Sequence, residues 1–534
     1  MTDIIKKTTG IVLAVCMAVT FTSGCGIGRS SEAPGSESSA APETGGAPAG
    51  FATDAPIKLT FYAPNQATAV AKDYNEVAFL IEMEKRSGIH IEWIHPVDDN
   101  QEQFNLMIAS GEYPDIMYAP WKTFYPGGSL QAAADGIIYP LDDLIAQHAT
   151  NLKALYSAFP DVKPYMYESD GHTYGFPQSF PSTGRGLTSV GPQINKTYLD
   201  ALGLEIPETI DEVEAVLAAF LTGDPDGNGV NDTIPILSAE FFAEDGYLMF
   251  LFCAYGVKPN FYQINGTAKY GPYEDGFKSA LDILHKWYQN EWLDNECVTD
   301  NWDTMPAKHT GGNVGMAYYW GNYEQTTGCD WEPMQYPVLT KGTKPQMCRA
   351  MPPLGNNMYS ISSTNKYPAE SVKWMDYLYG DEGSMLASWG IEGESYVITG
   401  GQPRFTDLVW ENPDGLSFSD VINKYTSLLH GFPFRSQFAA MSESRGEKGS
   451  RAYDIWNSID DRTVICPSQL TIEEQSDFDT MNSNVNTYRI EMITKFMMGT
   501  EPLSNYDNFV KTLKDFGSDK LLEYWQTSCD RFFK

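Results

Sequence analysis

Residues 104–116 read FNLMIASGEYPDI, and this stretch decides the fold because a helical pattern runs directly into a strand-like one. Apolar side chains recur at helical spacing in its first half, which predicts a helix over residues 102–110. A glycine and a proline then break the pattern. Residues 115–118 predict a short strand.

The same alternation extends upstream toward the N-terminus. Residues 57–65 predict a strand that ends in a loop with a proline and an asparagine, residues 76–88 a helix, and residues 90–95 another strand. Strands separated by helices of about ten or more residues pair in parallel, since a crossover has to return the chain to the same end of the sheet. We therefore expect an α/β fold whose sheet is covered on both faces.

Helix signals continue downstream. Thr209 and Glu212 have the spacing of a capping box and precede apolar residues at helical spacing. Further helices are predicted from about Glu274 and from Pro368. The chain has no internal repeat of fixed period, which argues against solenoids and propellers.

The composition is that of a packed globular protein. With 36 Lys+Arg against 70 Asp+Glu, the 534 residues carry a formal net charge of −34, which excludes nucleic acid as a partner. Hydrophobic residues make up 42% of the chain, and its length predicts at least two domains.

The N-terminal residues have the pattern of an export signal. Two lysines precede an apolar run that ends in small residues and Cys25, and the pattern resembles a bacterial lipoprotein signal. We expect residues 1–24 to be the signal peptide and Cys25 the lipidated residue, although Cys25 also fits an ordinary position in a tail. Residues 25–55, rich in Ser, Gly, Ala and Pro, predict a flexible tether.

Residues 224–232 read DPDGNGVND and have the spacing of an EF-hand loop. A hard cation takes about six to eight oxygen ligands, which alternate residues around a tight bend can supply. The site predicts a structural Ca²⁺, and the alternative is a turn that binds nothing. Position 12 is Pro235, so the last ligand comes from elsewhere or from water. The predicted ligands are Asp224, Asp226, Asn228, the Val230 carbonyl and Asp232.

Signals for catalysis are missing from the sequence. The six cysteines beyond Cys25 include no C-x-x-C pair, so zinc is not expected, and both disulfides and free thiols fit their spacing. The seven histidines lack metal-ligand spacing, and no nucleophile elbow or phosphate loop occurs. A carboxylate pair of a glycosidase would leave no pattern of this kind.

Read in order, five stretches identify the chain as resembling the extracellular solute-binding proteins of ABC importers. The resemblance is to the large sugar-type lipoprotein subgroup of Gram-positive bacteria and covers nearly the whole body after the tether. The stretches are residues 104–116, 171–178 (GHTYGFPQ), 199–207 (LDALGLEIP), 377–384 (YLYGDEGS) and 389–393 (WGIEG).

The resemblance implies a periplasmic-binding-protein-like fold of two α/β lobes with a hinge and a ligand cleft between them. Applied to this chain, lobe one comprises residues 56–182 and 345–395, and lobe two residues 183–344 and 396–534. The family closes its lobes around the ligand. It implies a monomer at the extracellular face of the membrane that delivers its ligand to permease subunits.

A sugar site combines aromatic platforms with polar groups that orient hydroxyls. The resemblance implies that seven residues at family loop positions contact the ligand. The alternatives are that the two tryptophans among them are core or surface residues, and that Arg185 and Glu392 are solvated or form structural ion pairs. The residues are Asn65, Tyr118, Trp121, Arg185, Trp320, Glu392 and Tyr396.

Three functions are compatible with these patterns. The first is capture of a carbohydrate, most simply an oligosaccharide, for import without chemical change. The second replaces the sugar with a peptide or another small solute. The third is a secreted calcium-dependent hydrolase or lyase that acts on polysaccharide.

Overall fold

The computed structural model describes residues 56–67, 69–96, 100–177, 180–181, 188–238, 248–294, 296–300, 304–321, 323–348, 352–354, 357–459 and 468–533. The predicted signal peptide, Cys25 and tether, as well as Arg185, lie outside these residues. Among the described residues, no helix has both the length and the apolar character needed to cross a bilayer.

The first sheet contains the elements that residues 57–118 predict. Its strand order is β2-β1-β3-β12-β4, with β1 parallel to both β2 and β3. The predicted alternation of strand and helix in this region is therefore confirmed. Two further strands, β12 and β4, extend the sheet in the antiparallel sense, which the sequence did not predict. The strands are β1 (Ile57–Tyr62), β2 (Ile89–Ile94), β3 (Ile116–Tyr118), β4 (Phe176–Pro177) and β12 (Asn357–Ile361).

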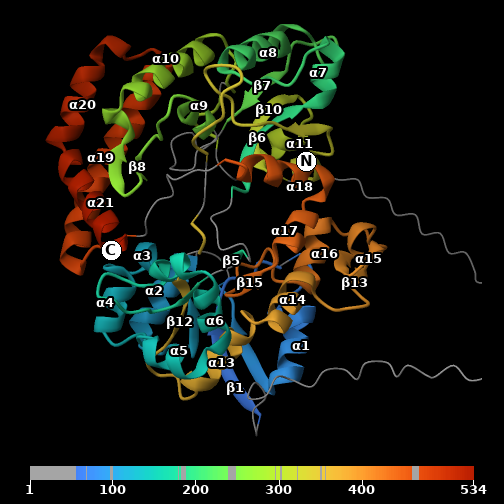
Figure 1. The fold of residues 1–534 in the computed structure, drawn as a ribbon, viewed down its shortest axis with the longest axis vertical. Coiled ribbons are helices and arrows are strands. Elements are labelled where there is room, and N and C mark those ends of the chain that lie inside the picture. The colour runs from blue at the N-terminus through green and yellow to red at the C-terminus, as the bar shows by residue number, and fades with distance from the viewer. Residues whose placement is uncertain are drawn as a thin grey trace, which may run out of the picture. The chain divides into compact units, whose positions relative to one another are not determined.

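Helices cover this sheet and bury an aromatic-rich core that includes Phe61, Trp93 and Trp374. Figure 1 shows α1, α5, α6 and α13 around β1 and β12. The helices of this part are α1 (Ala78–Ser87), α2 (Asn100–Ser110), α3 (Trp121–Phe124), α4 (Gly128–Ala134), α5 (Asp142–His148), α6 (Thr150–Ala158), α13 (Pro368–Tyr377) and α14 (Asp381–Trp389), with 3-10 turns η1 (Tyr74–Glu76) and η2 (Pro160–Met166).

The second sheet has the order β11-β6-β10-β7 and a separate core. β10 pairs in parallel with β7 and antiparallel with β6. The strands are β6 (Val190–Asn195), β7 (Ile234–Leu237), β10 (Val314–Trp320) and β11 (Trp331–Pro333), and a hairpin of β8 (Phe261–Ile264) and β9 (Thr267–Tyr270) packs on the same core.

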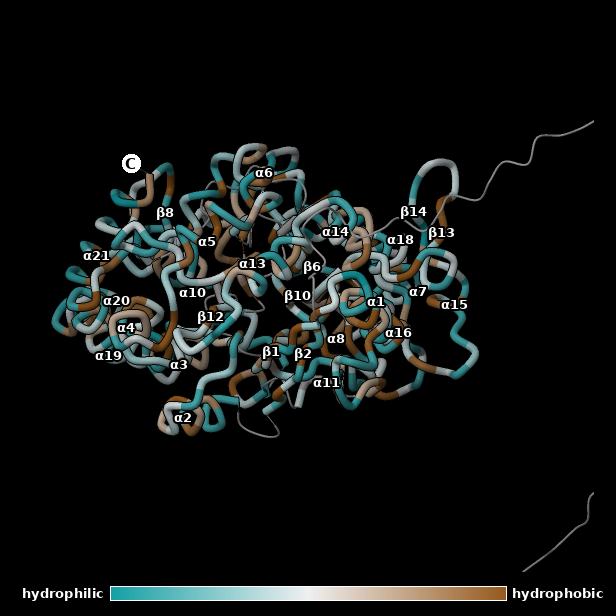
Figure 2. Tube along the Cα trace, turned by 90° about the horizontal axis from the view of Figure 1, so that it is seen from below, coloured by the Kyte–Doolittle hydropathy of each residue, from teal (hydrophilic) through white to brown (hydrophobic). Residues whose placement is uncertain are grey.

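The helices of the second part include the predicted capping box. Thr209 accepts a hydrogen bond from the Glu212 backbone, and the Glu212 carboxylate accepts one from the Thr209 backbone. The buried residues of α10 recur at helical spacing and include Phe277, Leu281 and Leu284. Figure 2 shows hydrophilic and hydrophobic residues interleaved along the trace of the body. The helices are α7 (Lys196–Leu202), α8 (Ile210–Thr222), α9 (Met249–Ala254), α10 (Asp275–Gln289), α11 (Met305–Thr310), α12 (Tyr323–Thr327), α18 (Gly446–Asn457), α19 (Ile472–Met498), α20 (Tyr506–Asp515) and α21 (Ser518–Phe532), with 3-10 turns η3 (Gly271–Tyr273) and η4 (Leu503–Asn505).

A third group of elements follows α14 and packs on a small core around Trp389. Phe432 and Phe434, which fall within this stretch of the chain, lie in the core of the first sheet. Phe438 and Met441 pack against the second core, which Ala452 then joins. The boundary at 395/396 stays a prediction. The elements are β13 (Tyr396–Thr399), β14 (Gln402–Phe405), α15 (Asp407–Trp410), α16 (Phe418–Tyr425), β15 (Arg435–Ser436), which pairs with β5 (Phe180–Pro181), and α17 (Phe438–Glu443).

Gly191 in β6 lies directly under the buried Trp456. A Cβ at this position would lie 2.3 Å from the indole Cε2, and the indole Nε1 is held by a 3.0 Å hydrogen bond to the Met334 carbonyl. We expect Gly191→Ala to lower the free energy of unfolding by roughly 1–3 kcal/mol, since a well-packed core resists added volume. Denaturant unfolding measures this loss.

The control is Gly311→Ala, where an added Cβ would meet nothing closer than 3.3 Å. Equal midpoints for Gly191→Ala and the unmodified protein would contradict the packing described for β6.

Candidate ligand-binding site

A cavity of about 220 Å³ lies where β1 and β3 end. In open α/β sheets, ligands bind outside the carboxyl ends of parallel strands, because the loops that follow leave the sheet at that edge. This cavity has that position, and residues from the 429–432 segment close it. It is lined by Ala63, Pro64, Gln66, Tyr74, Tyr118, Tyr359, Leu429, His430, Gly431 and Phe432.

Two tyrosine hydroxyls fix the walls of the cavity. The Tyr74 hydroxyl donates to the Pro64 carbonyl at 2.9 Å and accepts from the Gln66 backbone N–H at 2.9 Å, which holds the loop after β1. The Tyr359 hydroxyl donates to the Gly431 carbonyl at 2.6 Å. These bonds position the walls before any ligand arrives.

The side chains around the cavity are neutral. Burial raises the pKa of Tyr118 and raises that of Tyr74 to about 12. Burial lowers the pKa of His430 to about 4, an effect that the Asn423 backbone opposes. None of the described lining residues carries a charged side chain. The cavity can therefore stack against a ring and exchange hydrogen bonds, but it offers no nucleophile or ionised base.

Asn65 and Tyr118, two of the predicted ligand contacts, lie at this edge of the first sheet. Tyr118 is half-buried, lines the cavity and lies 5.2 Å from the Tyr359 ring. The Asn65 amide instead donates to the Ala71 carbonyl at 2.9 Å and accepts from the Ala67 backbone. Asn65 therefore shapes the loop, while Tyr118 faces the cavity.

The two predicted tryptophans have different surroundings. Trp121 is 3% exposed, and its Nε1 donates to the Ser360 hydroxyl at 2.8 Å. This is the core placement that the sequence left open as an alternative. Trp320 is half-buried at the carboxyl end of β10, in the second sheet.

Glu392 and Tyr396 lie together beyond α14, joined by an isolated β-bridge. Tyr396 is 8% exposed and packs against Trp389, while Glu392 is exposed. Neither lines the cavity at β1 and β3.

His430 is a cavity residue that the sequence analysis missed. It is 5% exposed and stacks on Tyr74 with ring centroids 5.1 Å apart. Nothing in the local sequence marks it, because Tyr74 and Phe79, two of the rings that hold it, precede it by more than 300 residues. A histidine among apolar neighbours gives no separate signal.

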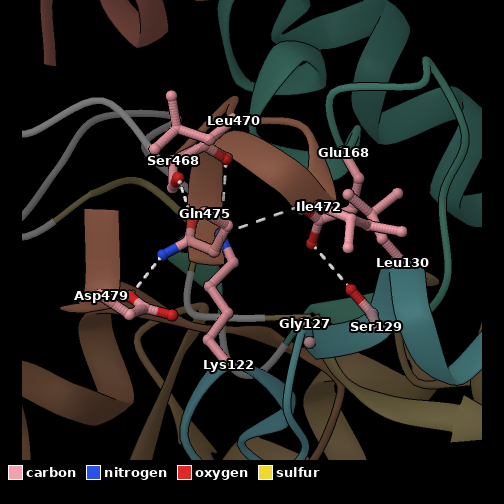
Figure 3. A pocket seen from close by; sticks show the side chains of 11 residues that line it. Lys122, Gly127, Ser129, Leu130, Glu168, Ser468, Leu470, Ile472, Gln475 and Asp479 are labelled. Atoms are coloured by element: carbon pink, nitrogen blue, oxygen red, sulfur yellow. Dashed lines mark hydrogen bonds and ion pairs between the residues drawn. The ribbon is translucent and has the colours of Figure 1, made fainter. Parts of the chain in front are cut away.

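Two other cavities have different character. Figure 3 shows one lined by Lys122 and Glu168 from the first part of the chain and by Ser468 and Gln475 near the start of α19. Its volume of about 30 Å³ holds roughly one water molecule, too little for a sugar. The other, of about 480 Å³, is an open hollow around α17 and α18 beside Trp410.

The predicted calcium loop brings its oxygens together between α8 and β7. The Asn228 amide nitrogen lies 2.8 Å from an Asp226 carboxylate oxygen and 3.2 Å from one of Asp232. Asp224 accepts from the Gly229 backbone at 3.1 Å through one oxygen, and its other oxygen is buried without a partner. Val230 is 57% exposed at the outer turn. A buried carboxylate oxygen without a partner fits a cation ligand.

A second acidic cluster is already neutralised. The carboxylates of Asp294, Glu296 and Asp300 lie close enough to hold a metal. The Lys308 ammonium, however, contacts all three at 2.7, 2.8 and 2.6 Å. Burial alone would lower the pKa of Lys308, but these hydrogen bonds outweigh it and raise the pKa. This lysine takes the place of an ion.

The described cysteines are free thiols: Cys253, Cys297, Cys329, Cys348 and Cys529. Of the alternatives that the sequence left open, the structure therefore has thiols at these positions.

Comparison with known proteins agrees with this architecture. Residues 62–385 match the model of the bacterial extracellular solute-binding protein family. The chain belongs to this family. The match includes β3 and β12, which contribute Tyr118 and Tyr359 to the cavity, and the loop after β1, whereas the 429–432 segment lies beyond it. The family resemblance expected from the sequence is confirmed.

Two relatives of this solute-binding protein extend the comparison. The fructooligosaccharide ABC transporter substrate-binding protein FusA of Streptococcus pneumoniae is 30% identical over 60% of this chain and 61% of its own length. The chain thus aligns with less than two thirds of FusA. Lipoprotein LipO of Bacillus subtilis is 21% identical over 83% of this chain and 86% of its own.

Solved structures share the fold over most of the described body. FusA in complex with kestose has a TM-score of 0.73 and 24% identity, covering 89% of this chain and 99% of FusA. A FusA EF-hand mutant in complex with fructo-nystose gives the same TM-score and coverage at 23% identity. The predicted periplasmic-binding-protein-like fold is therefore confirmed.

The buried histidines predict how stability depends on pH. The pKa of His430 and that of His309 are each lowered by burial from 6.5 to about 4. Below pH 6.5 the unfolded chain binds protons that the folded chain excludes, so stability falls between about pH 6.5 and 4. Each group contributes up to about 3 kcal/mol. Chemical unfolding across this range measures the slope.

We expect His430→Gln to flatten the slope, and His90→Gln, at an exposed position, to leave it unchanged. A slope that is the same in all three proteins would show that His430 does not titrate as described.

Proposed function

We propose that this chain is the lipid-anchored substrate-binding component of an ABC importer, which captures an oligosaccharide and delivers it without chemical change. The observation that carries this proposal is the neutral, aromatic-lined cavity at the carboxyl ends of β1 and β3. Tyrosine faces pack against sugar rings, and neutral hydrogen-bonding groups match hydroxyls. The similarity to FusA, a fructooligosaccharide ABC transporter substrate-binding protein solved in complex with kestose, supports the same class of ligand.

Capture by closure is supported by how the two sheet-centred parts touch. Their cores are separate, and polar contacts join residues 122–168 to the segment before α19, beside one aromatic contact between Tyr165 and Phe532. Gln469 Nε2 donates to the Tyr167 carbonyl at 2.8 Å, and Lys122 Nζ lies 3.5 Å from the Ser468 carbonyl. Polar contacts of this kind exchange with water at low cost, which favours relative motion of domains. Trp320, at the end of β10, is the proposed contact from the second lobe.

The family consists of binding proteins, and we propose no catalytic step. The cavity contains neither an ionised carboxylate pair nor a nucleophile among its described lining residues. We further propose that Cys25 carries the lipid that keeps the protein at the extracellular face of the membrane, which the similarity to Lipoprotein LipO supports.

Calcium belongs to the same proposal, as a structural ion in the 224–232 loop. The unpartnered Asp224 oxygen and the convergent carboxylates of Asp226 and Asp232 support it, together with an EF-hand in the FusA relative. Asp224, Asp226, Asn228, the Val230 carbonyl and Asp232 would hold the ion. Bound Ca²⁺ would neutralise the carboxylates and tie the end of α8 to the start of β7.

Calorimetry against neutral oligosaccharides and against peptides tests the function. We expect heat with at least one sugar and none with the peptides. Tyr118→Ala should lower the affinity for that sugar roughly tenfold, about 1.4 kcal/mol, because the cavity loses an aromatic wall. Tyr367→Ala, at a residue 43% exposed outside the cavity, should bind normally. Tight peptide binding with no sugar binding would favour the second candidate ligand class.

Removal of calcium tests the loop. A chelator should lower the melting temperature, since an ion at 100 times its Kd stabilises the folded state by about 2.7 kcal/mol. Asp224→Asn should lower the melting temperature without chelator, and chelator should then cause no further decrease. Asp414→Asn, at an exposed residue, should lose melting temperature with chelator as the unmodified protein does. Identical melting with and without chelator in calcium-loaded protein would refute the site.

A further inference from the structure

His430 is held in the cavity wall by rings on several sides. It stacks on Tyr74 with an interplanar angle of 14° and packs edge-on against Phe79 at 6.3 Å. Its backbone N–H donates to the Ser427 carbonyl at 3.1 Å. The imidazole is therefore fixed in orientation by packing and not by its own polar atoms.

Neither ring nitrogen of His430 makes a hydrogen bond of ordinary geometry with a described residue, and the Asn423 backbone is near enough only to oppose the fall of the His430 pKa. The ring is 5% exposed and lines the cavity. A buried polar group without a partner is costly, so such groups normally find one. The open cavity is the side from which a partner can come.

Two of the tyrosine hydroxyls of the wall are already used within the protein, while the Tyr118 hydroxyl and the Gln66 side chain also line the cavity. The Tyr74 hydroxyl bonds Pro64 and Gln66, and the Tyr359 hydroxyl bonds Gly431. A neutral imidazole has one donor and one acceptor nitrogen, and a sugar hydroxyl can serve either. Its burial keeps the ring neutral at pH 7.

Charge and size restrict the ligand further. No described lining residue is a cation that would pair with a carboxylate, so a uronate group would lose its hydration here without compensation. A volume of about 220 Å³ corresponds to roughly seven waters at about 30 Å³ each, which is room for one sugar residue. The rest of an oligosaccharide has to extend out of the cavity.

We propose that this cavity takes one terminal residue of a neutral oligosaccharide, and that His430 hydrogen-bonds a hydroxyl of that residue. This inference rests on the proposed function, because it names the ligand class and a specificity-determining residue of the same site. It excludes uronate oligosaccharides as ligands and requires a free chain end.

Calorimetry with the full chain tests both requirements. The probes are neutral trisaccharides of fructose, glucose, galactose or mannose, uronate trisaccharides of the same length, and a cyclic oligosaccharide of each neutral sugar that binds. We expect binding only among the linear neutral probes. Binding of uronates alone would overturn the inference while retaining carbohydrate capture. Equal affinity for cyclic and linear forms would overturn the chain-end assignment.

Variants test His430 itself. His430→Phe should lower the affinity for the neutral sugar roughly tenfold. His430→Gln keeps a donor and an acceptor, so its affinity should stay within about threefold of the unmodified protein. The control His90→Gln, at an exposed position, should leave the affinity unchanged. Unchanged binding by a folded His430→Phe would overturn the role of the residue. If no sugar of either class binds, the proposed function fails and this inference fails with it.

Discussion

Parallel pairing of β1 with both β2 and β3 is the constraint on which the candidate site depends. Each neighbour runs in the same direction as β1, in register from Ile57 with Ile89 to Tyr62 with Ile94 on one side. The loops after β1 and β3 must therefore leave at one edge. Tyr74 then ties the first of these loops, and the 429–432 segment covers the edge from elsewhere in the sequence. A cavity at this edge follows from strand direction before any ligand chemistry is considered.

Local sequence determined the elements of this arrangement well. The strands and helices between residues 57 and 118 form where spacing predicts them, because each needs only neighbours within a turn or a pleat. The Thr209 capping box is likewise contained in four residues. The aspartates of the 224–232 loop are close in sequence, so their convergence could be predicted without knowing the fold.

Contacts between distant segments could not be predicted in this way. His430 reaches Tyr74 only because residues after α16 return to the first core. Trp121 had the sequence context of a loop residue, but the antiparallel β12 supplies Ser360 and buries it. Asn65 matched a family loop position, yet its amide is used to shape the loop. In each case the deciding partner lies far along the chain.

The two acidic clusters show why residue type alone does not define a cation site. Asp294 and Asp300 are more buried than the carboxylates of the 224–232 loop, so their need for a counter-charge is greater. A buried anion is tolerated only when it is paired, and Lys308 meets that need from four or more residues away in the sequence. No lysine or arginine bonds the three loop aspartates in the described contacts, and one Asp224 oxygen is left without a partner. The requirement for a cation is therefore met by the chain itself in the first cluster, and this difference is why we propose an ion for the loop and none for the cluster.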